Sequence, residues 1–456
     1  MKRPEPKESA QTADFHRAIF EEHIEAAAFL YEQRLLRLGG AGQAWTGLAD
    51  IEQRIELHLD ALLVGHDPAL AVCAERAAAG EPGELFAALC VFCRRGNTEH
   101  TAVVLRALDP TEPARMHAVQ HALSQEMPRQ WVGFVEKAVA QRTDDTASVL
   151  AAVCAYRNLP LGHALVGPLA ATRPPKRALV DAVGRLRVRE SQPSLEACLD
   201  GDDDELKASA LLALCRIGAS GAWQQGLKSA LTQAWPRIPI GLAADPSGVR
   251  LLVELAGTQA ADASGLHALA LLGDPAALPA LCAALSRLEL AEAAAMALHW
   301  LTGAQLSDEV FVPDAVDESE LIGSELKAWK EQGKVPTRAD GRPYGDTVIR
   351  LSQDPARWQA WLAENGASLT PGLRHRLGRR CTPGVLVDTL GDLHSDMLLR
   401  HLSAQELAIR YGCEVPFDVE MPVAHQIRQL QEMGKWAEAQ AGRFEPGAWY
   451  FAGLGQ

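Results

Sequence analysis

Apolar side chains recur at spacings of three and four along most of the chain, the period of a helix that is buried on one side. Between residues 66 and 305, such helices return about every 30 residues, which is typical of a repeat array. The copies begin at Leu85, Met116, Ala147, Lys176, Leu206, Ser264 and Ala291. The interval between Leu206 and Ser264 is about twice the period, so we predict a degenerate copy there. The pattern predicts an all-α fold of stacked helical hairpins.

The clearest hairpin spans residues 266–285. Gly273 is predicted to end its first helix, because glycine enters the left-handed conformation without strain. Asp274 is predicted to cap the second helix, with Pro275 in its first turn. Pro279 follows one turn later and is predicted to bend that helix.

Less regular segments flank the array. Residues 1–65 are predicted to form an N-terminal helical cap, with helices over 14–38 and 47–64, because an array must cover its end. Residues 306–345 are acidic and rich in turn formers, which favours a connector. Residues 346–456 are predicted to form a C-terminal helical region with one or two further repeats. Its helices are predicted to begin at Asp354, Thr370, Thr382, Ser395 and Val423.

The hairpin sequence resembles a HEAT-like repeat. The residues that carry this resemblance are Gly273, Asp274, Pro275, Leu278 and Pro279. The resemblance implies an α-solenoid, a scaffold that recognises other molecules. Some HEAT-like proteins are enzymes, among them lyases and a hydroxylase with repeated His-Glu pairs for iron, but this chain contains no His-Glu dipeptide.

The whole chain, including residues 410–423, also resembles a family of bacterial proteins often encoded in type VI secretion gene clusters. This resemblance implies a role near effector secretion, as an accessory, adaptor or immunity protein.

Charge narrows the choice of partner. The formal net charge is -14, which disfavours nucleic acid and favours a basic protein, such as an effector or a secretion component. Two acidic groups are the candidate protein-binding residues: Asp202, Asp203, Asp204 and Glu205, and then Asp308, Glu309, Asp314, Asp317, Glu318 and Glu320. The alternatives are a helix-capping corner for the first group and a solubilising connector for the second.

The cysteines and the apolar stretches indicate the cellular compartment in which the protein is expected. Most of the nine cysteines fall in apolar helical runs and resemble reduced core residues, which favours the cytoplasm. The first residues lack the apolar core of a signal peptide. No stretch reaches the roughly 18 uninterrupted apolar residues needed to span a membrane, so no membrane insertion is predicted.

Three constellations have the residue types of metal sites. Cys90 and Cys93 form C-x-x-C, but no second ligand pair follows at zinc-site spacing, so core packing is preferred. His117 and His121 are four residues apart on a predicted helix, without a third ligand nearby in the sequence. Residues 391–396, GDLHSD, resemble part of a metallophosphoesterase motif, but helix capping by Ser395 explains them better. We therefore assign no metal, cofactor or catalytic residue.

The sequence thus predicts a non-enzymatic protein-binding scaffold, whose acidic loops and concave helix faces hold a protein partner. The first alternative is a HEAT-like metal-dependent or lyase-type enzyme that uses His117 and His121, or Cys90 and Cys93, on a small molecule or a protein. The second alternative is a self-assembling structural scaffold. The oligomeric state stays open.

Overall fold

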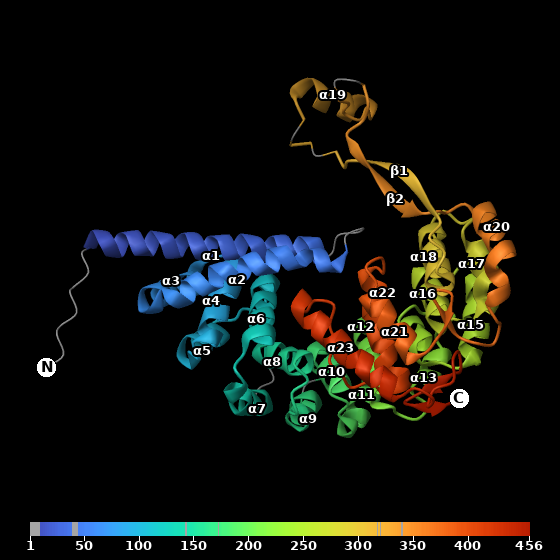
Figure 1. Ribbon diagram of the computed structural model, residues 1–456, viewed down its shortest axis with the longest axis horizontal. Coiled ribbons are helices and arrows are strands. Elements are labelled where there is room, and N and C mark those ends of the chain that lie inside the picture. The colour runs from blue at the N-terminus through green and yellow to red at the C-terminus, as the bar shows by residue number, and fades with distance from the viewer. Residues whose placement is uncertain are drawn as a thin grey trace.

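The computed structural model describes residues 10–38, 44–141, 144–171, 173–316, 318–319, 321–338 and 341–456. Within these ranges the chain forms 23 α-helices and three small two-stranded antiparallel sheets (Figure 1). The helices succeed one another in a curved array, and the last three α-helices of the chain lie on the inner side of the curve. The prediction of a mostly helical chain is confirmed.

The N-terminal helices form one end of this array. Helix α1 (Ala10–Leu38) packs along α2 (Ala49–Val64), α3 (His66–Ala79) and α4 (Pro82–Arg94). Helix α1 begins before Asp14, its predicted cap, because no helix breaker lies between residues 10 and 14.

None of the described helices is by itself long and apolar enough to cross a membrane. The segments Trp45–Val64 and His66–Ala79 together reach the required length and apolar content, but they are bent by 119°.

Beyond α3, the helices form two rows. Each helix of the inner row packs on the next helix of that row, and some pairs of alternate helices also pack on one another in the outer row. The inner row consists of α4, α6 (Pro113–Glu126), α8 (Asp145–Tyr156), α10 (Arg177–Arg185), α12 (Asp204–Ile217), α14 (Arg237–Ala243), α16 (Ala263–Leu272) and α18 (Ala291–Thr302). The outer row consists of α5 (Thr98–Arg106), α7 (Val132–Gln141), α9 (Gly162–Ala171), α11 (Gln192–Cys198), α13 (Ala222–Leu227), α15 (Pro246–Ala256) and α17 (Leu278–Ala284). Helices α13 to α15 occupy the interval of the predicted degenerate copy.

The hairpin of α16 and α17 shows how the sequence determines the turn between an inner-row helix and the next outer-row helix. Gly273 ends α16 with a φ of 75°, and Asp274 accepts a hydrogen bond from the Ala276 N–H at 2.9 Å, as predicted. The predicted bend at Pro279 is wrong. A 3₁₀ turn over Pro275–Ala277 comes first, so Pro279 lies in the first turn of α17, where its missing N–H breaks no helical hydrogen bond.

Most of the C-terminal region packs against the inner row, whereas its first helix packs on α17 of the outer row. Its helices are α20 (Pro355–Asn365), α21 (Pro383–Gly391), α22 (Met397–Glu406) and α23 (Val423–Ala439), with a π-helical turn at Leu407–Tyr411. Its strands are β3 (His375–Arg376), β4 (Arg379–Arg380), β5 (Tyr450–Phe451) and β6 (Leu454–Gly455). Apolar residues of this region, including Trp358 and Trp449, join the core of the array.

Two predicted helix starts in this region are wrong. The residues after Thr370 form a turn and the β3–β4 hairpin instead of a helix, because the Leu377 and His375 N–H groups bond to carbonyls of the array. The Leu377 N–H donates to the Trp300 carbonyl and the His375 N–H donates to that of Gly273. Helix α22 is capped by Asp396, whose carboxylate accepts from the Leu399 N–H, and not by Ser395.

The segment predicted as a connector is a structured arm. Strands β1 (Ser307–Pro313) and β2 (Gly345–Leu351) pair in antiparallel register, and helix α19 (Gly323–Gln332) lies between them in the sequence. Val310, Phe311 and Val312 in β1, and the run of three β-branched residues over 347–349 in β2, favour this pairing over a loop.

Candidate functional site

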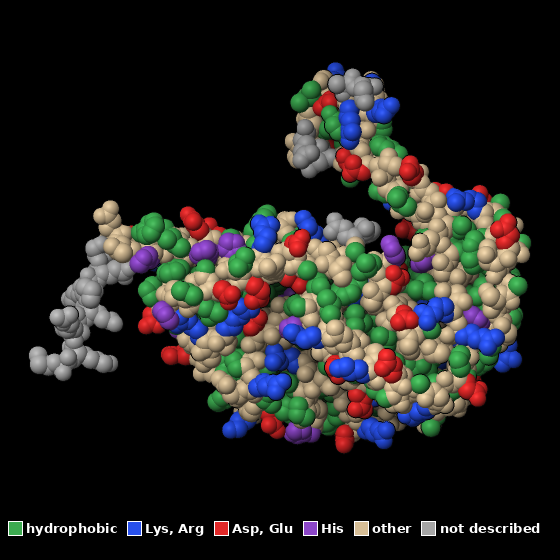
Figure 2. Space-filling model, in the orientation of Figure 1, with side chains coloured by type: hydrophobic (Ala, Val, Ile, Leu, Met, Phe, Trp, Pro, Cys, Tyr) green, Lys and Arg blue, Asp and Glu red, His purple; other side chains and the backbone are tan. Residues whose placement is uncertain are grey.

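An arm, residues 307–351, projects from the body, with α19 at its far end (Figures 1 and 2). The arm leaves the body after α18 and returns to it before α20. At its base, the Ser352 N–H donates to the Leu306 carbonyl at 2.7 Å, which holds the two ends of the arm together. Among the described residues, no second layer covers the faces of this two-stranded ribbon. A ribbon of this kind is by itself marginally stable.

Both faces of this ribbon carry exposed apolar side chains. Successive residues of a strand point to opposite faces, so Val310, Val312 and Val348 share one face, while Phe311 and Ile349 share the other. Phe311 is 45% exposed and Ile349 is 75% exposed. Contiguous exposed apolar side chains on an extended element are typical of protein-binding surfaces, so the arm is the first candidate site.

The arm also carries the second acidic group. In the part of the chain that the structure describes, these are Asp308, Glu309, Asp314 and Glu318; Asp317 and Glu320 lie outside the described residues. Asp308 forms an ion pair with Arg357 of α20 at the base of the arm. Glu318 lies 3.0 Å from Lys330 of α19. Of the described members, Asp308 and Glu309 belong to β1 itself and so lie beside the apolar faces.

The first acidic group lies apart from the arm, at the corner between α11 and α12. Asp203 caps α12, because it accepts from the N–H groups of Glu205 and Leu206. Asp204 pairs with Lys207 at 2.5 Å, and Glu205 pairs with Arg177 at 2.7 Å. Asp202 is exposed. Three of the four acids are thus engaged in capping or ion pairs, as the helix-capping alternative expects.

A strap, residues 412–423, crosses the inner row from α10 towards α2. Arg187 donates to the Cys413 carbonyl at 2.5 Å, and Arg185 pairs with Asp418 at 2.8 Å. Farther along, the Val423 N–H donates to Glu52 of α2 at 2.7 Å. Between the strap, α10 and α22 lies a cleft of about 220 Å³. The strap therefore covers part of the concave surface that was predicted to hold a partner.

The strap also brings a carboxylate to the predicted histidine pair. Glu420 Oε2 lies 3.1 Å from Nε2 of His121, and the ring centroids of His117 and His121 are 3.9 Å apart. One ligand atom from each of the three residues lies within 4.8 Å of the others. On the opposite side, the Tyr31 hydroxyl lies 3.1 Å from Nδ1 of His121.

The C-x-x-C pair has a different setting. Cys90 and Cys93 lie fully buried in α4, inside the apolar core of the array. Burial raises the pKa of the Cys93 thiol to about 12, so the thiol stays protonated at neutral pH. The two cysteines are therefore packed in the core, as the sequence analysis preferred.

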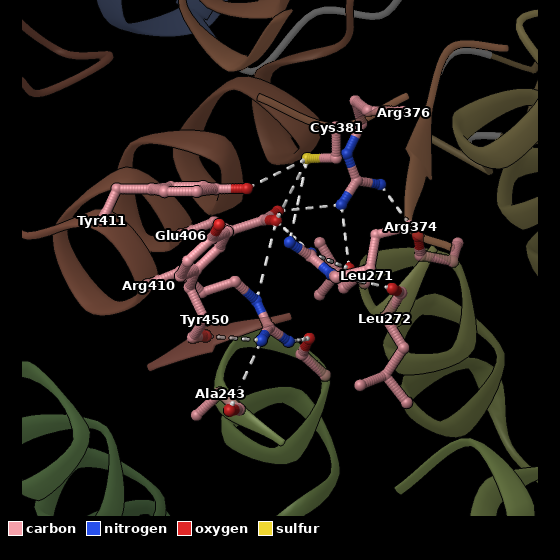
Figure 3. A network of polar contacts seen from close by, with 12 residues as sticks. Ala243, Leu271, Leu272, Arg374, Arg376, Cys381, Glu406, Arg410, Tyr411 and Tyr450 are labelled. Atoms are coloured by element: carbon pink, nitrogen blue, oxygen red, sulfur yellow. Dashed lines mark hydrogen bonds and ion pairs between the residues drawn. The ribbon is translucent and has the colours of Figure 1, made fainter. Parts of the chain in front are cut away.

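A fully buried ionic cluster joins the C-terminal region to the inner row (Figure 3). Glu406 lies at its centre, 2.9 Å from Arg376, in an ion pair with Arg374 and 3.8 Å from Arg410. Burial would raise the pKa of Glu406, but attraction to the three guanidinium groups outweighs it and lowers the pKa to about 2.

The arginines of this cluster also cap two helices. Arg374 and Arg376 donate to the carbonyls of residues 270–272, at the C-terminal end of α16. Arg410 donates to the carbonyls of Gly241 and Ala244, at the end of α14. The last carbonyls of a helix lack partners within it and carry partial negative charge, which guanidinium groups satisfy. We conclude that the cluster is a structural junction.

Sequence pattern reveals these candidate residues unequally. Glu420 is 299 positions from His121, so no motif spacing connects the two. By contrast, the strand-forming run Val310, Phe311 and Val312 is visible in the sequence. The acidic residues around it favoured the prediction of a connector instead of a strand.

In comparisons with known proteins, no family model, curated protein or solved structure matches this chain. The comparisons therefore do not link the chain to HEAT repeats or to type VI secretion.

Proposed function

We propose that this protein is a non-enzymatic protein-binding scaffold, a HEAT-like solenoid whose projecting arm docks a partner protein. The observation that carries the proposal is the pair of apolar faces on the arm, with Phe311 and Ile349 exposed on one of them. The stacking of alternate helices in two rows supports the solenoid class.

The arm is a better docking surface than the concave face of the array. The C-terminal region packs on the inner row, and the strap is held there by Arg185, Arg187 and Glu52. A partner in the concave face would have to displace these contacts, whereas the arm is already accessible (Figure 2).

Charge indicates the chemistry of the partner. Residues 307–351 contain ten acidic and six basic side chains, so the arm is acidic as well as apolar. A basic protein surface with an apolar centre would complement it, because opposite charge steers association while the apolar core supplies binding energy. With the resemblance to proteins encoded in type VI secretion clusters, this favours a basic effector or a secretion component as partner, and an accessory, adaptor or immunity role.

The test compares tagged wild-type protein with the double variant Phe311→Ser/Ile349→Ser, each purified from the native bacterium at moderate salt. We expect a stoichiometric protein to co-purify with the wild type and to be lost from the double variant. The matched control is Leu288→Ser, which removes an apolar side chain that is 91% exposed outside the arm. This control variant should retain the partner.

Both variants must show the thermal unfolding midpoint of the wild type, since the substituted side chains are exposed. Equal recovery of the partner by the double variant and the wild type would refute the assignment to the arm. Recovery of no protein by the wild type would refute the scaffold proposal itself.

A further inference from the structure

We propose that His117, His121 and Glu420 form a binding site for a divalent transition-metal ion, with zinc as the best match, which fastens the strap to helix α6. This site is independent of the arm and of the partner proposed for it. The three residues come from two segments that are far apart in the sequence and meet only in the folded protein.

The ligand set matches zinc chemistry. Two imidazole nitrogens and one carboxylate oxygen, completed by water, are a common zinc environment. His117 and His121 lie one helical turn apart on α6, a spacing that lets two imidazoles on one helix face reach the same ion. Glu420 approaches them from the strap, so the third ligand that the sequence lacked nearby is supplied by the fold.

The distances allow closure on an ion with small side-chain movements. Two ligand atoms of a tetrahedral zinc ion, each about 2.1 Å from the metal, lie about 3.4 Å apart. The three candidate ligand atoms lie within 4.8 Å of one another, and His121 and Glu420 are already 3.1 Å apart. His117 is partly exposed and the Glu420 side chain is 41% exposed, so both can rotate and solvent can deliver the ion.

A neighbouring hydroxyl orients the buried histidine. The Tyr31 hydroxyl lies 3.1 Å from Nδ1 of His121, and its ring stacks on Phe86 with centroids 3.9 Å apart. In the metal-free protein the 3.1 Å contact with Glu420 needs the ring proton on Nε2, so Nδ1 accepts from the Tyr31 hydroxyl. An ion that binds Nε2 displaces this proton, and Nδ1 can then carry the ring proton and donate it to the Tyr31 oxygen. Metal-bound histidines are usually oriented by a hydrogen bond of this kind.

The direct test is titration of EDTA-treated full-length protein with Zn²⁺ by calorimetry. We expect one ion per chain and a rise in the thermal unfolding midpoint, since an ion that binds only the folded state stabilises it. His117→Gln and Glu420→Gln should each weaken binding more than about 100-fold, and Tyr31→Phe should weaken it about 10-fold to 100-fold.

The matched control is His163→Gln, which changes a His–Glu pair on the outer row, where His163 Nε2 lies 2.9 Å from Glu136. This control variant should bind zinc as the wild type does. His117 is only partly buried, so we expect the His117→Gln variant to fold normally. The thermal unfolding midpoints of the metal-free wild type and variant test this expectation.

A second measurement locates the ion. Hydrogen exchange of the strap amides should slow when zinc is added to the wild type and stay unchanged in His117→Gln. With Co²⁺ in place of zinc, the visible spectrum should lack the strong sulfur charge-transfer band of a cysteine-bound ion. Absence of zinc binding by the wild type, undiminished binding by His117→Gln or Glu420→Gln, or a sulfur charge-transfer band would each overturn the proposal and leave an ordinary His–Glu ion pair.

Discussion

The side chains of Arg374, Arg376, Glu406 and Arg410 are fully buried where the C-terminal region meets the inner row. Three guanidinium groups surround one carboxylate, and their remaining N–H groups bond largely to carbonyls at the ends of α14 and α16. A buried charge without a partner costs several kcal/mol, so each member of such a cluster depends on the others. At the scale of single residues, the cluster makes Glu406 the most consequential side chain of the junction.

Removing the carboxylate should therefore destabilise the protein strongly. We expect Glu406→Ala to lower the free energy of unfolding by about 3–5 kcal/mol, because three buried cations lose their counter-charge. Urea unfolding monitored by circular dichroism measures this change. Asp388→Ala, which breaks the exposed pair of Asp388 with Arg379, is the control and should leave the midpoint nearly unchanged. Equal effects of the two variants would contradict the structural role of the cluster.

Glu406 should also shape the acid stability of the protein. Its pKa falls from an ordinary value of 4.5 to about 2 in the folded protein, so its contribution is complete above about pH 4.5 and is lost as the pH falls towards 2. This contribution is roughly 3 kcal/mol. The difference in unfolding free energy between wild type and Glu406→Gln should shrink over that interval. Urea titrations at a series of pH values test this, and a constant difference would refute it.

At the scale of elements, the sequence predicts helices well where their signals are local. The apolar period and the Gly273–Asp274 corner predicted α16 and its boundary with the next helix, because capping depends on neighbours in the chain. The residues after Thr370 carry a similar start signal, yet their N–H groups bond to α16 and α18, which no local pattern encodes. The candidate metal site divides in the same way: the spacing of His117 and His121 is visible in the sequence, but Glu420 reaches His121 only through the fold.

The approach of β3 to the end of α16 gives a test at this scale. An added Cβ on Gly273, whose φ is 75°, would lie 2.5 Å from the His375 carbonyl oxygen. Gly412 has a φ of 77° and no atom within 4 Å of such a Cβ. We expect Gly273→Ala to lower the unfolding free energy by about 1–3 kcal/mol more than Gly412→Ala, which isolates the close contact from backbone strain. Equal losses in chemical denaturation would show that β3 does not restrict this position.

At the scale of the whole molecule, the protein divides into a closed body and an extended arm. The body has an apolar core that continues from the array into the C-terminal region, whereas the ribbon of the arm exposes apolar residues on both faces. The arm therefore contributes little to the stability of the body, although it carries the proposed binding surface.

Replacing residues 308–350 by a short Gly-Ser linker should leave the thermal unfolding midpoint within about 2 °C of the wild type. The ends of the deletion stay adjacent, because the Ser352 N–H bonds to the Leu306 carbonyl. In limited proteolysis of the wild type, the arm should be cut first, since exposed extended segments are preferred sites. A large fall in the midpoint of the deletion variant would show that the arm supports the body.

The strap has a consequence for synthesis. It joins the two ends of the chain, since Val423 and Glu52 are 371 positions apart and Glu420 and Arg34 are 386 positions apart. At ribosomal speeds of about 5–20 residues per second, roughly 20 to 75 s pass between the emergence of Glu52 and that of Val423. During this interval the nascent array exposes the surface that the strap will cover. A message truncated before the codon for Val423 would therefore yield a chain that cannot form this closing contact.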